Sequence, residues 1–199
     1  MDADTLLALA GFAFASTWTP GPNNMMLASS GATYGWQRTL PHAMGVALGF
    51  PLMVFLIALG LGEVFETYPA FQTGVGWAGF AVMLYLAWRI GTAGRARADG
   101  GRGRPLSFLE AAGFQWINPK AWVMAIGTAA TYASGAAPLF EASIVAAVFC
   151  AAGLTSSQAW ALFGAGLGQF LGDGLRLRIF NGAMGVLLAV SAFWLVIDA

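Results

Sequence analysis

Lys120 is the residue of this 199-residue chain that packing explains least well, because it lies inside an apolar stretch over residues 108–133. An ammonium group at membrane depth costs about 2.5–3.5 kcal/mol, so such a lysine usually faces a water-filled cavity or a partner. No Asp or Glu is expected at the same depth in any other apolar stretch. Three roles are open: Lys120 binds an anionic group of a substrate, it titrates, or it hydrogen-bonds carbonyls freed by a helix break.

Such breaks are predicted at two clusters of proline and polar residues, Thr19-Pro20-Gly21-Pro22-Asn23-Asn24 and Asn118-Pro119-Lys120. A proline inside a helix leaves the carbonyl four residues earlier without its N–H partner. The prolines of the two clusters therefore free the carbonyls of Ser16, Trp18 and Gln115. At membrane depth a break of this kind is tolerated only inside the protein or around a cavity.

Each break also offers the start of a new half-helix. Asn118-Pro119 is typical of a helix N-cap followed by proline at the first helical position. In the first cluster the same signal occurs at Thr19-Pro20, or at Asn23 or Asn24 after Pro22. Half-helix N-termini carry partial positive charge and unpaired N–H groups, which suit an anion. Freed carbonyls suit a cation, so the pattern favours a small zwitterion such as an amino acid.

The rest of the chain supplies the elements that position these residues. Hydrophobic residues make up 58% of the chain and charged residues 9%, whereas a soluble domain has about 25% charged residues. Hydropathy at the scale of a membrane span, about 19 residues, gives six apolar stretches: residues 5–30, 41–62, 70–90, 108–133, 139–165 and 179–197. We therefore predict an all-α membrane protein with six transmembrane helices, of which the first and fourth are broken.

The charged residues predict how these helices cross the bilayer. Arginines fall only on the connections of one side: Arg38, Arg89, Arg95, Arg97, Arg102, Arg104, Arg176 and Arg178. The opposite connections and both chain ends carry only acids: Asp2, Asp4, Glu63, Glu66, Glu141 and Asp198. By the positive-inside rule the arginine side is cytoplasmic. We expect a multi-pass protein of the bacterial inner membrane with both termini outside.

The chain is predicted to be one transmembrane domain, residues 1–199, made of two halves. The first half covers residues 1–92, a solvated cytoplasmic Gly/Arg linker covers 93–107, and the second half covers 108–199. Halves of three helices each have opposite orientations in the membrane, which is the arrangement of a 3+3 inverted repeat. Pro20 and Pro119, 99 residues apart, lie in the first helix of each half.

Small residues at a spacing of four predict close helix contacts, since they let backbones approach each other in lipid. They are Gly45 and Gly49 in the second stretch and Gly164, Gly168 and Gly172 in the fifth. Packing alone is the preferred interpretation of this pattern. Glycine faces on so small a bundle are also compatible with a homodimer.

Two motifs of this chain resemble the signatures of the LysE/RhtB family of amino-acid exporters. One is Pro20-Gly21-Pro22-Asn23-Asn24 with Gly31, Gly35, Gly45 and Gly49, and the other is Phe114-Gln115-Trp116-Ile117-Asn118-Pro119-Lys120-Ala121. The resemblance covers the whole chain and implies an inner-membrane secondary transporter that exports an amino acid or a derivative by proton exchange. Carried onto this chain, the family's motif residues are Gly21, Pro22, Asn23, Asn118, Pro119 and Lys120.

The pattern and the resemblance together predict a substrate site near the middle of the membrane, formed by Pro20, Gly21, Pro22, Asn23, Asn24, Asn118, Pro119 and Lys120. Alternating access would expose this site to each side in turn. A cationic amino acid would need a carboxylate in the cavity, and none is evident, so a neutral substrate is favoured. The coupling group stays open, because His42 near the inner mouth of the second helix and Lys120 are both candidates.

Other functions fit the sequence less well. A transporter of another solute or of a divalent cation is one alternative, but metal ions want clustered carboxylates, His or Cys, and His42 and Cys150 are far apart in sequence. An intramembrane enzyme is not expected, because neither Gly-x-Ser-x-Gly nor His-Glu-x-x-His occurs. In a non-transporting subunit, Lys120 and both breaks would serve folding alone. No cofactor, metal or nucleic-acid partner is expected.

Overall fold

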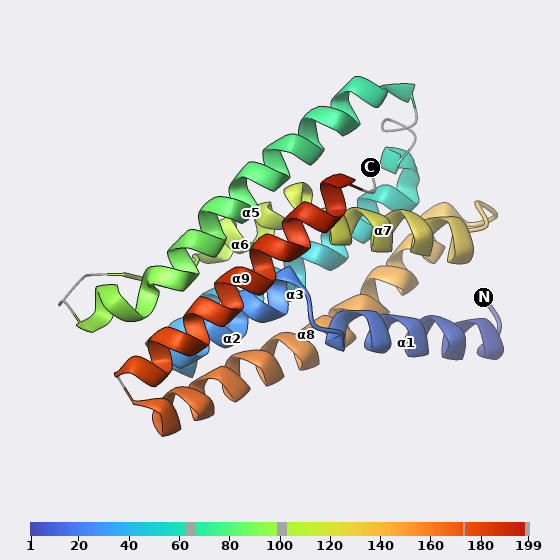
Figure 1. Cartoon of the computed structure of the whole chain (residues 1–199). Helices are drawn as coiled ribbons and strands as arrows, with labels where there is room; N and C mark the ends of the chain where they lie inside the picture. Colours follow the sequence, from blue (N-terminus) through green and yellow to red (C-terminus); the bar gives the residue numbers. More distant parts are fainter. Residues whose placement is uncertain (63–66, 99–102, 173, 198–199) are drawn as a thin grey trace.

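The computed structural model describes residues 1–62, 67–98, 103–172 and 174–197, and no strand occurs among them. The helices in chain order are α1 (Ala3–Trp18), α2 (Pro22–Tyr34), α3 (Trp36–Leu56), the π-helical segment η1 (Ile57–Leu61), α5 (Pro69–Ala98), α6 (Phe108–Phe114), the 3-10 turn η2 (Gln115–Ile117), α7 (Pro119–Tyr132), α8 (Pro138–Leu171) and α9 (Leu175–Ile197) (Figure 1). Each of the apolar stretches predicted from the sequence is helical.

The first and fourth apolar stretches are both interrupted, as predicted. α1 ends at Trp18 because Thr19 precedes a proline and is extended, with ψ 132°. In the fourth stretch α6 tightens into the turn η2, and Asn118, again before a proline, is extended with ψ 107°. The chain resumes as α2 after the first interruption and as α7 after the second.

The starting points of the two resumed helices differ from each other. α7 starts as predicted, with Asn118 at the N-cap position and Pro119 in the first turn. The prediction of Thr19, Asn23 or Asn24 as the start of α2 was wrong, because Gly21 is its N-cap residue and Pro22 lies in its first turn. Pro22 has a fixed φ and no N–H, which suits this position, whereas Pro20 lies in the extended connection.

Three helices of the described part are long and apolar enough to cross a membrane: Trp36–Leu61, Pro138–Leu171 and Leu175–Phe193. The broken stretches are not among them, because the breaks leave segments of 16 residues (α1), 13 residues (α2) and 14 residues (α7). About 20 apolar residues are needed to cross a bilayer in one helix. The large apolar side chains on the surface include Leu7, Leu109 and Phe170, which are 75%, 77% and 78% exposed.

Part of the segment predicted as a linker, residues 93–107, is helical or packed. α5 continues to Ala98, because alanine and arginine favour a helix whether or not it packs. Residues 99–102 lie outside the described part. At the other end Pro105 is buried and Leu106 packs against the hydrophobic core.

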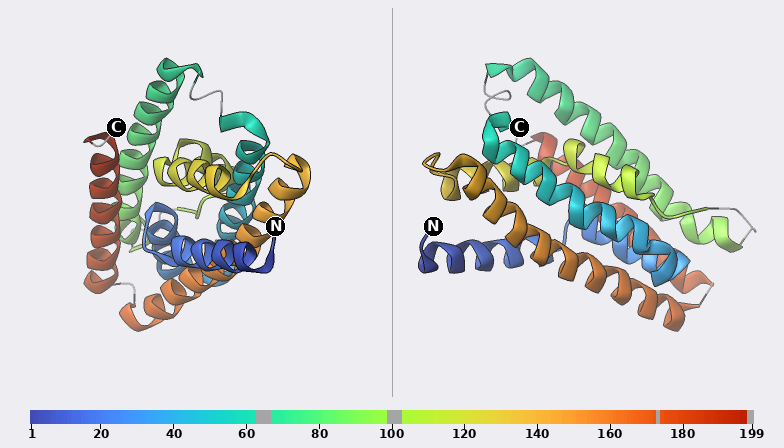
Figure 2. Two further views of the ribbon diagram at one scale, coloured as in Figure 1. Left: turned by 90° about the vertical axis from the view of Figure 1, so that its right-hand side faces the viewer. Right: turned by 180° about the vertical axis from the view of Figure 1, so that it is seen from behind.

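The helices pack as a bundle (Figure 2). α8 lies along α2, α3 and the end of α1, α5 pairs with α9, and α6 packs on α3. A single residue, Gly35, joins α2 to α3, and its φ of 81° is the left-handed conformation that favours glycine.

The spaced glycines lie at helix contacts. A Cβ atom on Gly164 would lie 2.7 Å from the carbonyl carbon of Ala28, and one on Gly168 would lie 2.7 Å from the Cα of Ala32, so α8 and α2 touch backbone to backbone. Gly45 and Gly49 contact α6 in the same way. Gly172 instead ends α8 with φ 65°, and a Cβ atom there would have no neighbour within 4 Å.

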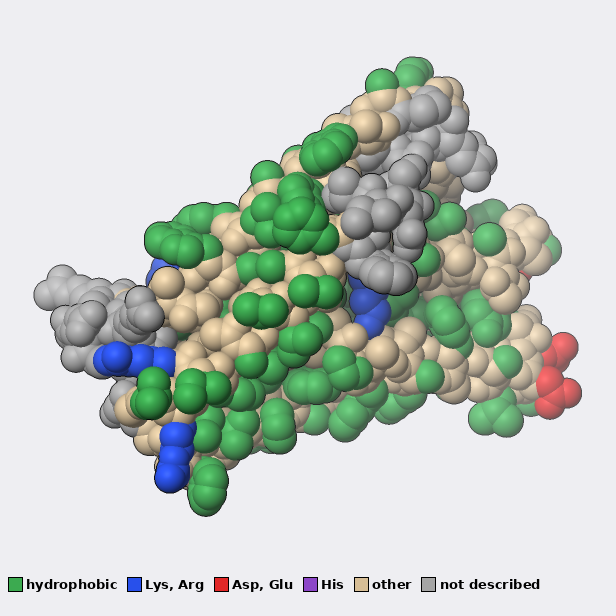
Figure 3. All heavy atoms as spheres, in the orientation of Figure 1, with side chains coloured by type: hydrophobic (Ala, Val, Ile, Leu, Met, Phe, Trp, Pro, Cys, Tyr) green, Lys and Arg blue, Asp and Glu red, His purple; other side chains and the backbone are tan. Residues whose placement is uncertain are grey.

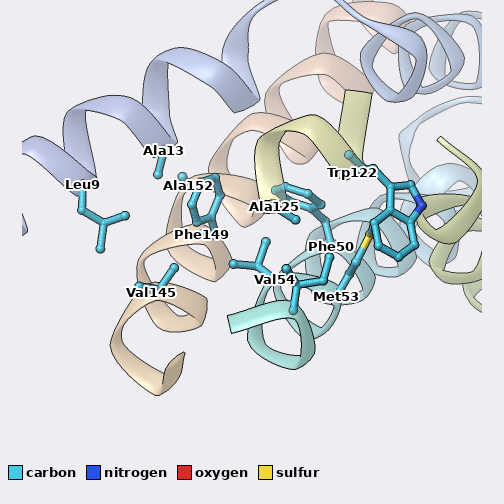
Figure 4. Packing of buried hydrophobic residues seen from close by; sticks show 12 residues of the cluster. Leu9, Ala13, Phe50, Met53, Val54, Trp122, Ala125, Val145, Phe149 and Ala152 are labelled. Atoms are coloured by element: carbon cyan, nitrogen blue, oxygen red, sulfur yellow. The ribbon is translucent and has the colours of Figure 1, made fainter. Parts of the chain in front are cut away.

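One hydrophobic cluster holds α1, α3, α7 and α8 together (Figure 4). Phe149 of α8 is completely buried at its centre, and its ring meets Phe50 edge-on at a centroid distance of 5.4 Å. Leu9, Val54 and Val145 pack around these rings. In lipid such packing is driven by van der Waals contact more than by release of water.

Apart from Lys120 at the cavity between the two interruptions and Glu110, which pairs with Arg104, the described acids and arginines lie at opposite ends of the bundle (Figure 3). One end, called here the arginine-rich end, carries Arg38 in the first turn of α3, Arg104 before α6, and Arg176 and Arg178 at the start of α9. The opposite end, called the acidic end, has Asp2 and Asp4 at the start of α1 and Glu141 at the start of α8. Glu63, Glu66 and Asp198, predicted for the acidic side, lie outside the described residues, as does Arg102 of the arginine side.

The glycine contact between α2 and α8 makes a prediction. Gly164→Ala forces α8 away from the Ala28 backbone, and overpacking of this kind typically costs about 1–3 kcal/mol. Gly166→Ala is the matched control, because Gly166 is exposed on the same helix and has no neighbour within 4 Å of a new Cβ. Thermal unfolding in detergent should show a lower midpoint for Gly164→Ala and an unchanged or higher one for Gly166→Ala. Equal midpoints would show that the contact does not stabilise the bundle.

Candidate functional site

A cavity of about 510 Å³ lies where the two interruptions meet. Its walls come from α2, the end of α1, the start of α7 and the facing sides of α3 and α8. The polar residues in its lining are Ser16, Thr17, Asn23, Asn24, Asn118, Lys120, Ser156 and Ser157. The others are Gly21, Pro22, Val46, Phe50, Pro51, Ala121, Met124 and Gly153. A mainly apolar lining with a few polar groups is typical of small-molecule sites, so the cavity suits a small solute.

Lys120 is the one charged side chain among the described residues that line the cavity. It is half-buried, and its Nζ atom donates to the Thr19 carbonyl at 3.3 Å. An ammonium has three donors, so this long hydrogen bond leaves most of its capacity unused. Gly21 lets the side chain reach across the break, since a Cβ there would lie 2.9 Å from Nζ.

The carbonyls at the end of α1 are paired by side chains. Asn24 Nδ2 donates to the carbonyls of Thr17 and Thr19 at 2.8 and 3.0 Å, and Ser156 Oγ of α8 donates to that of Thr17 at 2.8 Å. The sequence had predicted freed carbonyls at Ser16, Trp18 and Gln115. The side-chain partners fall on Thr17 and Thr19 because α1 stops at Trp18 and the chain is extended before α2.

A reciprocal amide pair closes the cavity on the side of α6. Asn23 Nδ2 donates to Gln115 Oε1 at 2.8 Å, and Gln115 Nε2 donates to Asn23 Oδ1 at 3.2 Å and to the Ala111 carbonyl at 2.8 Å. Gln115 is completely buried. The pair joins the two interruptions directly.

The two resumed helices start at the cavity without side-chain caps. Neither Gly21 nor Asn118 makes a capping hydrogen bond. Asn118 is 2% exposed, and its Oδ1 atom is buried with no hydrogen-bond partner among the described residues. Buried polar atoms are rarely left unpaired in a folded protein, so Asn118 Oδ1 is a candidate contact for a solute in the cavity.

A wider hollow extends from the cavity toward the acidic end. It measures about 970 Å³, lies between α1 and α7, and shares Ser16, Lys120 and Met124 with the cavity. The remaining lining includes Phe12, Thr131 and Tyr132. In this conformation Lys120 is therefore approached from the acidic end.

The structure brings most of the sequence-predicted site residues together. Gly21, Pro22, Asn23, Asn24, Asn118 and Lys120 line the cavity, whereas Pro20 and Pro119 shape the interruptions without lining it. Sequence reasoning missed Ser16, Thr17, Gln115, Ser156 and Ser157. Ser156-Ser157 interrupts the apolar run of the fifth stretch and Gln115 that of the fourth, and these polar residues were the signal available.

An all-helical, multi-pass membrane protein with a polar cavity between two interrupted helices has the architecture of a solute translocator. Comparison of the sequence with protein families agrees, because residues 14–199 match the model of the LysE type translocators. The chain belongs to this family. The resemblance inferred from the two motifs is thereby confirmed.

The cysteine/O-acetylserine efflux proteins are similar to this chain. That of Escherichia coli O157:H7 is 31% identical over 133 residues, which cover 66% of this chain and 67% of the relative. That of Escherichia coli strain K12 is 30% identical over the same shares, and that of Shigella flexneri is 30% identical over 64% of this chain and 65% of the relative. No solved structure matches the chain.

The role of Asn24 at the first interruption can be tested. Asn24→Ala removes two hydrogen bonds to backbone carbonyls, each worth about 0.5–1.5 kcal/mol net, and should lower the thermal midpoint in detergent. Ser143→Ala is the control, since it removes one hydroxyl hydrogen bond, Ser143 Oγ to the Leu139 carbonyl, at an exposed position of α8. A midpoint for Asn24→Ala no lower than that of the control would contradict this role.

Proposed function

We propose that this protein exports a neutral amino acid, or a derivative of one, from the cytoplasm across the bacterial inner membrane. The proposal rests on the cavity between the two interruptions, in which Lys120 has no acidic partner among the described lining residues. Family membership supports it, as do the relatives named for the efflux of cysteine and O-acetylserine.

One wall of the cavity suits a carboxylate. The Lys120 ammonium retains free donors, and the uncapped starts of α2 and α7 add backbone N–H groups and the positive ends of two helix dipoles. Because a buried lysine is costly without a partner, a substrate carboxylate at Nζ would recover part of that free energy.

The lining also offers acceptors for an ammonium group. The Ser16 and Thr17 hydroxyls donate to the Ala13 carbonyl at 3.2 and 2.7 Å, and that of Ser156 donates to the Thr17 carbonyl. A hydroxyl that has donated its proton still presents oxygen lone pairs, and Asn118 Oδ1 is an acceptor without a partner among the described residues. Donors and acceptors in one cavity match a zwitterion.

The substrate side chain would lie against Val46, Phe50 and Met124, the apolar part of the lining. A cationic side chain would need a carboxylate there, and the described lining residues include none. This supports a neutral substrate of the size of cysteine or O-acetylserine.

We further propose that the six helical stretches all cross the membrane as a 3+3 inverted repeat, with the arginine-rich end in the cytoplasm and both termini outside. α3 packs on α8 and α5 on α9, so helices at corresponding positions of the two halves pair with each other. The contact of α1 with α8 likewise corresponds to that of α6 with α3. The charge separation supports the orientation.

Transport would proceed by alternating access and be driven by proton exchange, as in an antiporter. The hollow between α1 and α7 and the closed Asn23–Gln115 pair support an outward-facing state in this structure. Opening of the amide pair, with closure of α1 on α7, would then expose the cavity to the cytoplasm. A homodimer is compatible with this scheme and not needed for it.

The test is efflux from proteoliposomes loaded with a mixed amino-acid pool under an imposed pH gradient. The wild type should release a few neutral amino acids selectively, with cysteine and O-acetylserine the first to assay. Lys120→Ala should lower their efflux by more than about tenfold, since a hydrogen bond to a charged group contributes about 1.5–3 kcal/mol. Arg176→Gln, an exposed change at the arginine-rich end, should leave efflux unchanged.

Folding of each variant is checked by its thermal midpoint and elution profile. If the wild type moves no amino acid, the export proposal is wrong. If efflux is selective but Lys120→Ala behaves as the wild type, the protein is an exporter whose site lies elsewhere. If efflux does not depend on the pH gradient, proton coupling is wrong but the export function stands.

A further inference from the structure

A second cavity of about 390 Å³ lies at the arginine-rich end, apart from the cavity at Lys120. α2, α3 and α5 form its walls, and the segment 103–107 closes it. Its lining shares no residue with the first cavity. The polar groups that decide its chemistry are Ser30, Tyr34, His42, Arg89 and Arg104.

His42 is buried in the wall of this second cavity, with one ring nitrogen unpaired among the described residues. Its ring is 1% exposed, Nδ1 lies 3.2 Å from Ser30 Oγ, and Nε2 is buried with no hydrogen-bond partner among the described residues. When the Ser30 hydroxyl donates to Nδ1, the ring proton is on Nε2. Nε2–H is then a donor without an acceptor, which is costly inside a protein.

Arg89 lines the same cavity, and its guanidinium has no acidic contact among the described residues. Its guanidinium makes one long hydrogen bond, to the Arg104 carbonyl at 3.4 Å, and stacks 5.8 Å from the centre of the Tyr85 ring. Neither contact is with an acid. A guanidinium has five donors arranged to bind a carboxylate through two of them, and most of these are unused.

Arg104, by contrast, is already neutralised. It binds both carboxylate oxygens of Glu110 at 2.6 and 2.8 Å, which raises the pKa of the Arg104 guanidinium above its ordinary value. None of the described residues that line the second cavity is Asp or Glu. Among the described lining residues, Arg89 is therefore the cation without an acidic partner. His42 and Tyr34 line the same cavity.

We propose that the second cavity is a binding site for a small carboxylate, held by Arg89 and His42. On the export function proposed above, this carboxylate is that of the substrate, collected from the cytoplasm before it reaches Lys120. The two cavities lie along the same helix: Asn23 and Asn24 of α2 line the first, and Ser30 and Tyr34 line the second. On this proposal the Asn23–Gln115 pair separates the two cavities. Breaking its hydrogen bonds would let a carboxylate pass from Arg89 to Lys120.

The experiment measures initial uptake of labelled cysteine, kept reduced, into inside-out membrane vesicles, whose outer face is the cytoplasmic side. Arg89→Gln should raise the KM for cysteine roughly tenfold, the order expected for the loss of a hydrogen bond to a charged group, with Vmax within about twofold of the wild type. Arg178→Gln is the matched control, because it removes the same charge at an exposed position of the same end. It should leave KM unchanged.

A second variant keeps Arg89 and fills the site instead. Ala93 lines the cavity and is partly buried, so Ala93→Glu places a competing carboxylate there and should raise KM as Arg89→Gln does. Two competitors test the carboxylate and the amine of the substrate separately. 3-Mercaptopropionate, which has the carboxylate and no amine, should inhibit transport by the wild type more strongly than transport by Arg89→Gln. Cysteamine, which has the amine and no carboxylate, should not discriminate between them.

The outcomes separate this inference from the proposed function. If Arg89→Gln and Ala93→Glu match Arg178→Gln while the wild type transports cysteine, the second site is overturned and the export function stands. If no protein transports cysteine but Lys120-dependent efflux of other amino acids occurs, the same comparison is made with one of those. An Arg89 effect that appears only in proteoliposomes containing phosphatidylglycerol, and not in pure phosphatidylcholine, would assign the cavity to a lipid headgroup and overturn the substrate assignment.

Discussion

The pairing of backbone polar groups inside an apolar medium is the constraint on which this structure depends. A helix that stops in such a medium exposes carbonyls and N–H groups that water cannot reach. Asn24 and Ser156 pair the carbonyls at the end of α1, and Trp122 Nε1 pairs that of Trp116 at the second interruption. The N–H groups at the starts of α2 and α7 have no such side-chain caps. The carbonyl groups at the helix ends are thus paired with side chains, whereas the N–H groups at the starts of α2 and α7 remain available to a ligand in the cavity.

This asymmetry explains why a lysine is tolerated at the same place. Lys120 lies beside two helix N-termini, whose dipoles disfavour a cation, so its position is electrostatically unfavourable for the fold itself. The hydrogen bond of Lys120 to the Thr19 carbonyl offsets only part of this unfavourable electrostatic energy. Binding sites commonly hold such locally unfavourable groups, because their compensation comes with the ligand.

Much of this arrangement could be predicted from particular residues. Proline with neighbouring asparagine located both interruptions, and a charge in an apolar stretch identified Lys120. The start of α2 was misplaced because Thr19, Asn23 and Asn24 are all better capping residues than glycine, and only the contact with Lys120 explains Gly21. The end of α5 was misplaced because hydropathy marks where a helix leaves the apolar phase, not where its hydrogen bonds stop.

Other parts of the site could not be predicted in this way. Ser156 is far in sequence from Ser16 and Thr17, and small hydroxyl residues are common in apolar helices, where they bond their own carbonyls. Gln115 belongs to one motif and pairs with Asn23 of the other. These relations depend on which helices pack together, and one sequence without aligned relatives carries little information on that.

The glycine contact between α2 and α8 has a mechanical consequence. Where two helices touch through side chains, rotamer changes let them slide, but Gly164 and Gly168 bring the α8 backbone directly onto Ala28 and Ala32 of α2. Asn24 and Ser156 also bind the same carbonyl, so α1, α2 and α8 are tied at that point. α2 and α8 should therefore move as one rigid unit together with the end of α1, although they belong to different halves of the chain. Movement between the halves is then expected where α1 faces α7 across the hollow, rather than where α2 contacts α8.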